Sequence, residues 1–143
     1  MTSEPTPAER LGILVKETQS VLHQRMDAAL RPLELTVPQY ACLQALADVP
    51  GISSSELARR AFVSRQSMNV LLTGLERRGL VERSDVPGPR RERAALLTPP
   101  ASALLADARA AVAAVADTMV SRLSAEDAAR LHALLSECRD ALR

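Results

Sequence analysis

The sequence predicts a mainly α-helical protein with one small β-hairpin, and three observations lead to this fold class. The 143-residue chain holds one Tyr and one Phe, so its core must be built from Leu, Val and Ala, which suits helices packed on helices. Apolar residues recur at helical spacing through most of the chain. Between residues 80 and 97 the pattern changes to two short strands around a turn. We expect one domain of this class.

Start and stop signals define the helices of the first half. The capping pattern from Thr6 to Glu9 opens a helix over 7–31, which stops at Arg31-Pro32. A second capping pattern, from Thr36 to Gln39, opens a helix to about Asp48. A third, from Ser53 to Glu56, opens a short helix to about Arg60. We therefore expect a long first helix followed by two shorter ones.

The second half contains one more short helix, the hairpin and two long helices. Ser64 is placed to cap a helix that Gly79 ends as its C′ residue. Strands are expected over 80–84 and 93–97, around the turn-forming segment 85–90. Thr98 caps an Ala-rich helix to about Leu123, and Ser124 starts a last helix that runs to the C-terminus.

Positive charge is concentrated in the middle of the chain. The net charge is +1, yet the segment from Arg59 to Arg93 carries nine arginines against four acidic residues. A basic segment on an otherwise acidic chain favours binding to a polyanion, because neutralised phosphates supply most non-specific affinity for nucleic acid. Charge alone leaves an ordinary solvated face equally open.

The helix over 64–79 combines an apolar stripe with a polar face. At 100° per residue Met68, Leu72 and Leu75 fall on one side, with Leu71 beside them. The opposite side presents Gln66, Asn69, Thr73 and Arg77, with Arg65 at its N-terminal flank. Arg pairs with guanine, and Asn or Gln with adenine, through two hydrogen bonds in the major groove. The alternative is an ordinary amphipathic surface helix.

The neighbouring elements favour the DNA-binding interpretation of this helix. A short helix, a three-residue turn (Ala61, Phe62, Val63) and the 64–79 helix make a helix-turn-helix, whose second helix enters the major groove. The hairpin that follows carries Arg90, Arg91 and Arg93 at or near its tip, suited to phosphates or the minor groove. Together these elements predict a winged helix-turn-helix with a small β-hairpin wing.

The sequence resembles the MarR (multiple-antibiotic-resistance regulator) family of bacterial and archaeal transcription factors. The resemblance rests on "SSSELARRAFVSRQSMNVLLTGLERRGLVER" (53–83) and on the wing exit "RRERAALLT" (90–98), with matching helix order along nearly the whole chain. It implies an obligate homodimer that binds double-stranded DNA. It also implies base contacts by Ser64, Arg65, Gln66, Ser67, Asn69 and Thr73, and a wing tip at Arg91 with Arg90 beside it. One departure is Pro89, where family wings usually carry an aspartate.

The first helix and the last two helices have apolar stripes wider than one small winged domain could cover. Burial of such stripes favours a large obligate interface. We expect residues 7–31 and 99–143 to form dimerisation helices and residues 33–98 to form the winged DNA-binding region. The alternative is the closed core of a monomeric bundle. A symmetric dimer would recognise a palindrome with half-sites about one helical turn apart.

A ligand site is expected from the resemblance together with two residue types. Tyr40 could line a crevice between the dimer base and the winged domain, as similar positions do in the family, with His23 as a polar handle from the first helix. This pair favours a small aromatic carboxylate or phenol as effector. The alternative is that Tyr40 is a core residue.

The remaining chemistry points away from catalysis. No nucleophile-and-base spacing, phosphate loop or paired-carboxylate motif is present, so we expect neither an enzyme nor a cofactor. His23 and His132 lack companion ligands, so no metal site is expected. Cys42 and Cys138 are interpreted as small buried hydrophobic residues. With no signal sequence and no run of eighteen apolar residues, a cytoplasmic protein without membrane contact is expected.

These observations predict a homodimeric DNA-binding transcriptional regulator, more often a repressor than an activator in the family, which a small molecule releases from a palindromic operator. One alternative is a redox-switched regulator that uses the thiol of Cys42 or Cys138. Another is a winged helix used only for protein contacts, in which the arginines would meet acidic protein surfaces.

Overall fold

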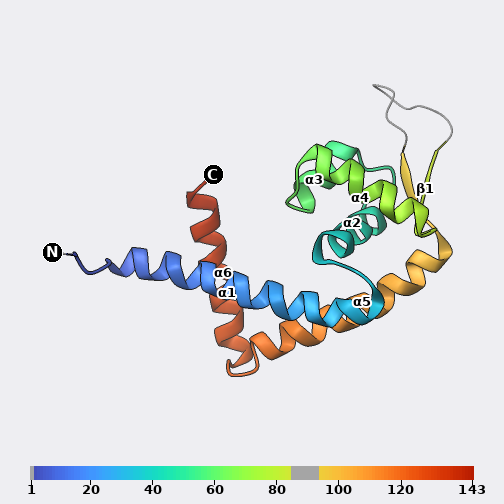
Figure 1. The fold of residues 1–143 in the computed structure, drawn as a ribbon. Coiled ribbons are helices and arrows are strands. Elements are labelled where there is room, and N and C mark those ends of the chain that lie inside the picture. The colour runs from blue at the N-terminus through green and yellow to red at the C-terminus, as the bar shows by residue number, and fades with distance from the viewer. Residues whose placement is uncertain (1, 85–93) are drawn as a thin grey trace.

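The computed structural model describes residues 2–84 and 94–143. These ranges contain six α-helices and a small two-stranded sheet, which lies at one end of the molecule beside α4 and the start of α5 (Figure 1). The elements, in chain order, are α1 (Pro7–Leu30), the 3-10 turn η1 (Arg31–Leu33), α2 (Val37–Asp48), α3 (Ser54–Arg60), α4 (Arg65–Arg77), β1 (Val81–Arg83), β2 (Ala95–Leu97), α5 (Pro99–Met119) and α6 (Ala125–Ala141). The predicted fold class is confirmed.

The helix starts predicted from the sequence are also confirmed. Thr6 and Thr36 form reciprocal capping boxes, in which the threonine hydroxyl accepts from the backbone N–H three residues later and that residue's side chain accepts from the threonine N–H. A hydroxyl also caps each of the other four helices, from Ser53, Ser64, Thr98 and Ser124. Since a cap involves residues only three positions apart, its signal is local and legible in sequence.

Some element ends differ from the prediction by a few residues. α1 ends at Leu30, after which η1 and a left-handed Glu34 (φ 56°) turn the chain. α5 ends at Met119, four residues before the expected end. β1 begins at Val81 because the N–H of Leu80 donates to the carbonyl of Leu75 and so completes the end of α4. The stop predicted at Arg31-Pro32 is therefore one residue late, whereas no comparable signal marks the end of α5.

The hydrophobic core lies in the winged region, among α2, α3, α4 and the strands. Leu43, Leu57 and Leu75 are fully buried there, as are Met68 and Cys42. The first half of α5 closes the core with Ala101, Leu105 and Ala108. The strands pair antiparallel with Val81 opposite Leu97 and Arg83 opposite Ala95. The core therefore fixes α4 against α3 and against β1 of the hairpin.

Two polar contacts strengthen this arrangement at the end of α4. The buried hydroxyl of Thr98 donates to the carbonyl oxygen of Gly79 at 2.7 Å, and the Thr98 N–H donates to the carbonyl of Leu80 at 3.2 Å. The Arg78 guanidinium donates to the carbonyl oxygen of Glu34 at 2.6 Å, which joins α4 to the turn after α1. The position of α4 is thus tied to the helices on either side of the winged region.

The long helices extend beyond the winged region. α1 packs along α5, and α6 turns away from the end of α5 (Figure 1). α1 buries only Leu30 and α6 buries none of its residues. Large apolar side chains on these helices are therefore exposed in the single chain, among them Leu14 (56%), Val21 (60%) and Leu134 (56%). These are the stripes that the sequence predicts to need a partner surface.

Among the described residues, no helix combines the length and the apolar character needed to cross a bilayer.

Candidate nucleic-acid interface

Helix α4 is held by one side and presents the other to solvent. Met68, Leu72 and Leu75 have at most 1% of their surface exposed. Gln66, Asn69, Thr73 and Arg77 are all exposed, as is Arg65 at the first position of the helix. The predicted polar face is therefore accessible enough to enter a groove of DNA. Burial of the opposite face fixes the orientation of α4 in the protein.

The N-terminus of α4 is organised by two serines. The Ser64 hydroxyl accepts from the Ser67 N–H at 3.0 Å and donates to the Ser67 Oγ at 2.9 Å. Both residues are exposed, and both belong to the predicted contact set. An N-terminus of this kind concentrates partial positive charge, so it suits a phosphate oxygen nearby.

Thr73 can offer fewer hydrogen bonds to a base than its position on the polar face suggests. Its hydroxyl donates to the carbonyl oxygen of Asn69 at 2.9 Å. The hydroxyl hydrogen is thus used within α4. Thr73 retains an oxygen acceptor and a methyl group for contact with a base, whereas Gln66 and Asn69 retain side-chain amides that can donate and accept together.

The turn between α3 and α4 contains a strained residue. Phe62 adopts φ 57°, in the left-handed region, and 95% of its surface is exposed. The N–H of Phe62 donates to the carbonyl of Arg59, and the N–H of Val63 donates to the carbonyl of Ala58. The same hydrogen-bond pattern ends α4, where Gly79 occupies the left-handed position with φ 72°. Glycine is the usual residue there because it lacks a Cβ.

Several arginines of the basic segment have partners within the chain. Arg59 and Arg60 lie 3.2 and 3.7 Å from the Glu56 carboxylate, and Arg83 lies 3.6 Å from that of Glu76. Ion pairs at exposed positions are worth about 1 kcal/mol or less. A DNA phosphate could therefore replace these carboxylates at small cost.

The wing is present as the β1–β2 pair, and it extends beside α4 (Figure 1). This confirms the predicted pair of strands, each of which is two residues shorter than expected. Arg90 and Arg91, together with Pro89 and Arg93, lie outside the described residues.

Val70 is a surface residue of α4 that the sequence reasoning passed over. At 100° per residue it lies about 40° from Gln66 and about 60° from Thr73, at the edge of the polar face. It is 71% exposed. Its helical spacing places it there, but a valine side chain forms no hydrogen bond and so gives no signal of base readout in the sequence.

The predicted ligand residue Tyr40 lies where α2 meets α5. It is half-buried: part of its surface packs against the core and part remains accessible. Burial raises the pKa of Tyr40 above its ordinary value of 10.0, while the nearby positive charge of Arg109 acts in the opposite direction. Arg109 donates to the Gln44 side-chain oxygen at 2.6 Å and lies 3.9 Å from the Asp48 carboxylate.

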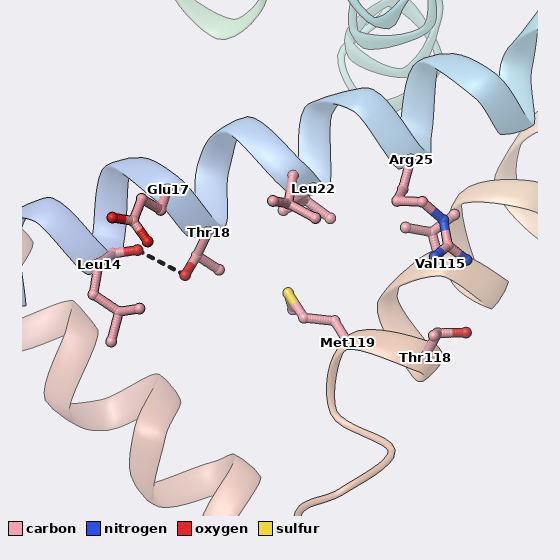
Figure 2. Close-up of a pocket in the computed structure, with 9 residues that line it drawn as sticks. Leu14, Glu17, Thr18, Leu22, Arg25, Val115, Thr118 and Met119 are labelled. Carbon is pink, nitrogen blue, oxygen red and sulfur yellow. Dashed lines mark hydrogen bonds between the residues drawn. The ribbon is translucent and has the colours of Figure 1, made fainter.

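A separate cavity of about 400 Å³ lies between α1 and α5. Figure 2 shows Leu14 and Leu22 from α1 and Met119 from α5 extending toward it, with the Thr18 hydroxyl bonded to the Leu14 carbonyl at 2.7 Å. The other lining residues are Glu17, Val21, Arg25, Val115 and Thr118. Neither Tyr40 nor the exposed His23 lines this cavity. It continues the exposed apolar stripes of the same two helices.

The two cysteines differ in environment. Cys42 is fully buried, as expected, and burial raises the pKa of its thiol to about 12. The interpretation of Cys138 as a buried residue is wrong for the single chain, in which Cys138 is exposed. The reason is that α6 packs against little else in the chain, so its apolar side is left in solvent. Among the described residues, no cluster of three or more His, Cys, Asp or Glu side chains could hold a metal ion.

Comparison with known proteins agrees with this geometry. The sequence profile of the MarR family matches residues 33–92. The HTH-type transcriptional repressor Rv2887 of Mycobacterium tuberculosis is 42% identical over 115 residues, which cover 80% of this chain and 83% of the relative. The crystal structure of Rv2887 with salicylic acid superposes with a TM-score of 0.76 at 36% identity, over 96% of this chain and 99% of that one. Its structure with DNA gives a TM-score of 0.73 at 36% identity, over 95% and 98%. The chain belongs to the MarR family of dimeric, winged helix-turn-helix transcriptional regulators.

Proposed function

We propose that this protein is a transcriptional repressor that binds a palindromic operator as a homodimer and leaves it when a small aromatic molecule binds. The observation that carries the proposal is α4, whose buried stripe fixes an exposed face of amide and guanidinium groups. Those groups recognise base edges in the major groove. The relative Rv2887 is named a repressor and has been solved with DNA, which supports the same role here. The role needs no cofactor, no catalysis and no membrane, and it belongs in the cytoplasm, where chromosomal DNA is accessible.

The contacts divide into readout and positioning. Arg65, Gln66 and Asn69 carry base readout, and Thr73 adds an acceptor. Ser64 and Ser67, at the start of α4, bind phosphate or the nearest base edge. Arg90 and Arg91 of the wing neutralise phosphates or enter the minor groove alongside. Both arginines lie outside the described residues, so the support for their role comes from the sequence.

The dimer uses the exposed stripes of the long helices. Residues 7–31 and 99–143 form the dimer base, and residues 33–98 form the winged region. The apolar cavity between α1 and α5 continues this surface. A helix of the second copy would fill it and remove its apolar lining from water. The exposed leucines of α6 are the available counterpart, since they are otherwise left in solvent.

The effector site is at the junction of α2 and α5, where Tyr40 offers an aromatic ring and Arg109 a positive charge for a carboxylate. His23 of α1 is a further polar group for the same ligand. The complex of Rv2887 with salicylic acid supports an aromatic acid as the ligand class. Since α2 belongs to the winged region and α5 leads into the dimer base, a ligand wedged between them changes the separation of the two α4 helices. It releases DNA only if it binds the incompetent separation more tightly.

The DNA-binding function is tested by a gel shift with the DNA upstream of the protein's own gene. Wild-type protein is expected to bind this duplex more tightly than a scrambled duplex. Gln66→Ala and Asn69→Ala should each lose about 1 to 3 kcal/mol of that preference. Glu126→Ala, at an exposed position of α6, is the control and should bind like wild type. Equal affinity of the wild type for both duplexes would favour a winged helix used for protein contacts.

The effector proposal is tested with salicylate as the probe. Salicylate is expected to raise the melting temperature of the wild type and to release bound DNA, because a ligand stabilises the state that it binds. Tyr40→Ala and Arg109→Ala should lose both effects, whereas Arg122→Ala, an exposed arginine near the end of α5, should keep them. Release that is unchanged in both variants would remove Tyr40 and Arg109 from the site.

A further inference from the structure

Val70 occupies the exposed side of α4, opposite the buried stripe of Met68, Leu72 and Leu75. It lies on the same side as Gln66 and Thr73, and about 160° from the buried Met68. Its 71% exposure shows that the single chain gives it little burial. A lone exposed valine needs no explanation elsewhere on a surface. Here it lies next to Gln66, at the edge of the residues that we assign to base readout, so DNA binding would remove it from water together with them.

The chemistry of the groove limits what Val70 can meet there. Guanine, cytosine and adenine present hydrogen-bonding groups at the major-groove edge, whereas thymine also presents a C5-methyl group. A valine placed against a donor or acceptor would leave that polar group desolvated and unpaired, which is costly. Against the thymine methyl group the same side chain makes favourable apolar contact.

We propose that Val70 recognises a thymine C5-methyl group in each half-site of the operator. This inference rests on the proposed function, because it requires α4 to enter the major groove. It adds a base preference to that function: an A·T pair at the position that Val70 faces, next to the pair contacted by Gln66. The hydroxyl hydrogen of the neighbouring Thr73 is held by the Asn69 carbonyl, so Thr73 does not offer a donor to the same base.

The test replaces single thymines by uracil, which differs only by the missing methyl group. The probe is a palindromic duplex that wild-type protein enriches from a random library. Each symmetric pair of thymines is replaced in turn by deoxyuridine, and the dissociation constant is measured. For one pair, wild-type affinity is expected to fall about fifteenfold, or about fourfold per half-site, which corresponds to about 0.8 kcal/mol for each buried methyl group.

Val70→Ala provides the matching protein variant. It should fold normally, because the side chain is exposed and alanine favours a helix more than valine does. It should bind the thymine duplex more weakly than wild type and be insensitive to uracil at the same pair, while Gln66→Ala should remain sensitive there. A merely structural role of Val70 would weaken binding without removing this sensitivity.

Two results would overturn the inference. An enriched duplex in which no uracil replacement changes wild-type affinity by more than twofold would exclude methyl recognition and leave the proposed function intact. Equal uracil sensitivity of wild type and Val70→Ala at every pair would assign the methyl contact to another residue. A library with no enrichment at all would instead overturn the proposed function itself.

Discussion

Phe62 has a backbone conformation that is unfavourable for a residue with a side chain. The turns after α3 and after α4 have the same backbone hydrogen bonds, yet one has phenylalanine and the other glycine at the left-handed position. A side chain in this conformation costs about 1 kcal/mol. Phe62 regains none of this through burial, because 95% of it is exposed.

We therefore expect Phe62→Gly to stabilise the protein. The free energy of unfolding should rise by about 0.5 to 1 kcal/mol, after allowance for the greater freedom of glycine in the unfolded chain. Gly79→Ala is the matched variant with the opposite sign: a Cβ at Gly79 meets no atom within 4 Å, so its cost is conformational. Urea unfolding at one fixed protein concentration measures both. A loss of stability in Phe62→Gly would mean that the ring packs against another part of the dimer.

Cys42 allows a prediction about the redox alternative. Its thiol has a pKa of about 12, raised by burial, and thiolate is the reactive form. In folded protein at pH 7, maleimide should leave Cys42 unmodified, although it should label Cys42 readily in guanidinium chloride. Peroxide should not release DNA through this residue. Rapid labelling of Cys42 in the native protein, with loss of DNA binding, would restore the thiol switch.

The same shift has a consequence for stability at high pH. The folded-state pKa lies above the ordinary value of 9.0, so between pH 9 and about pH 12 the unfolded chain releases a proton that the folded chain retains. The contribution of Cys42 to stability is therefore complete below pH 9 and is lost as the pH rises toward 12. The stability difference between wild type and Cys42→Ala should shrink over this interval, and a constant difference would contradict the assigned burial.

At the scale of the elements, helix starts were more predictable from the sequence than strand ends and the contacts between elements. The caps of Thr6, Thr36 and Ser64 depend on residues three positions away, so the sequence alone located them. Strand ends depend on which carbonyl a neighbouring helix takes, as at Leu80, and were misplaced by a residue or two. Arg109 could not be linked to Tyr40 in advance, because α2 and α5 meet only in the fold. The prediction that Cys138 is buried was wrong for the single chain, because α6 has few neighbours within its own chain.

α6 provides the prediction at this scale. Leu134 is 56% exposed in the single chain, so an aspartate there disturbs no core of that chain and acts only on an interface. Leu134→Asp should convert the dimer to a monomer at low micromolar concentration, or leave it insoluble, because a charge in an apolar interface costs several kcal/mol. Sedimentation velocity measures the change. Ala133→Asp, which lies about 100° around the helix and on its other side from Cys138, is the control and should stay dimeric; a stable Leu134→Asp dimer would exclude this stripe from the interface.

For the whole molecule, function requires two copies. One α4 helix contacts only a few base pairs, and the spacing of two such helices in a symmetric dimer adds a second level of sequence recognition. The exposed stripes of α1, α5 and α6 indicate which surfaces join the copies, and the α2–α5 junction connects that base to the winged regions. Sequence reasoning reached this organisation through the pattern of apolar residues, although a single chain cannot display the spacing.

Selection of duplexes from a random library by the purified wild-type protein tests this account most directly. We expect enrichment of a palindrome whose half-sites have centres about 10 base pairs apart, with A·T and G·C positions that change in the Gln66→Ala and Asn69→Ala proteins. Absence of enrichment, or an enriched motif that is unchanged in both variants, would contradict the central claim that α4 reads DNA sequence as one of a symmetric pair.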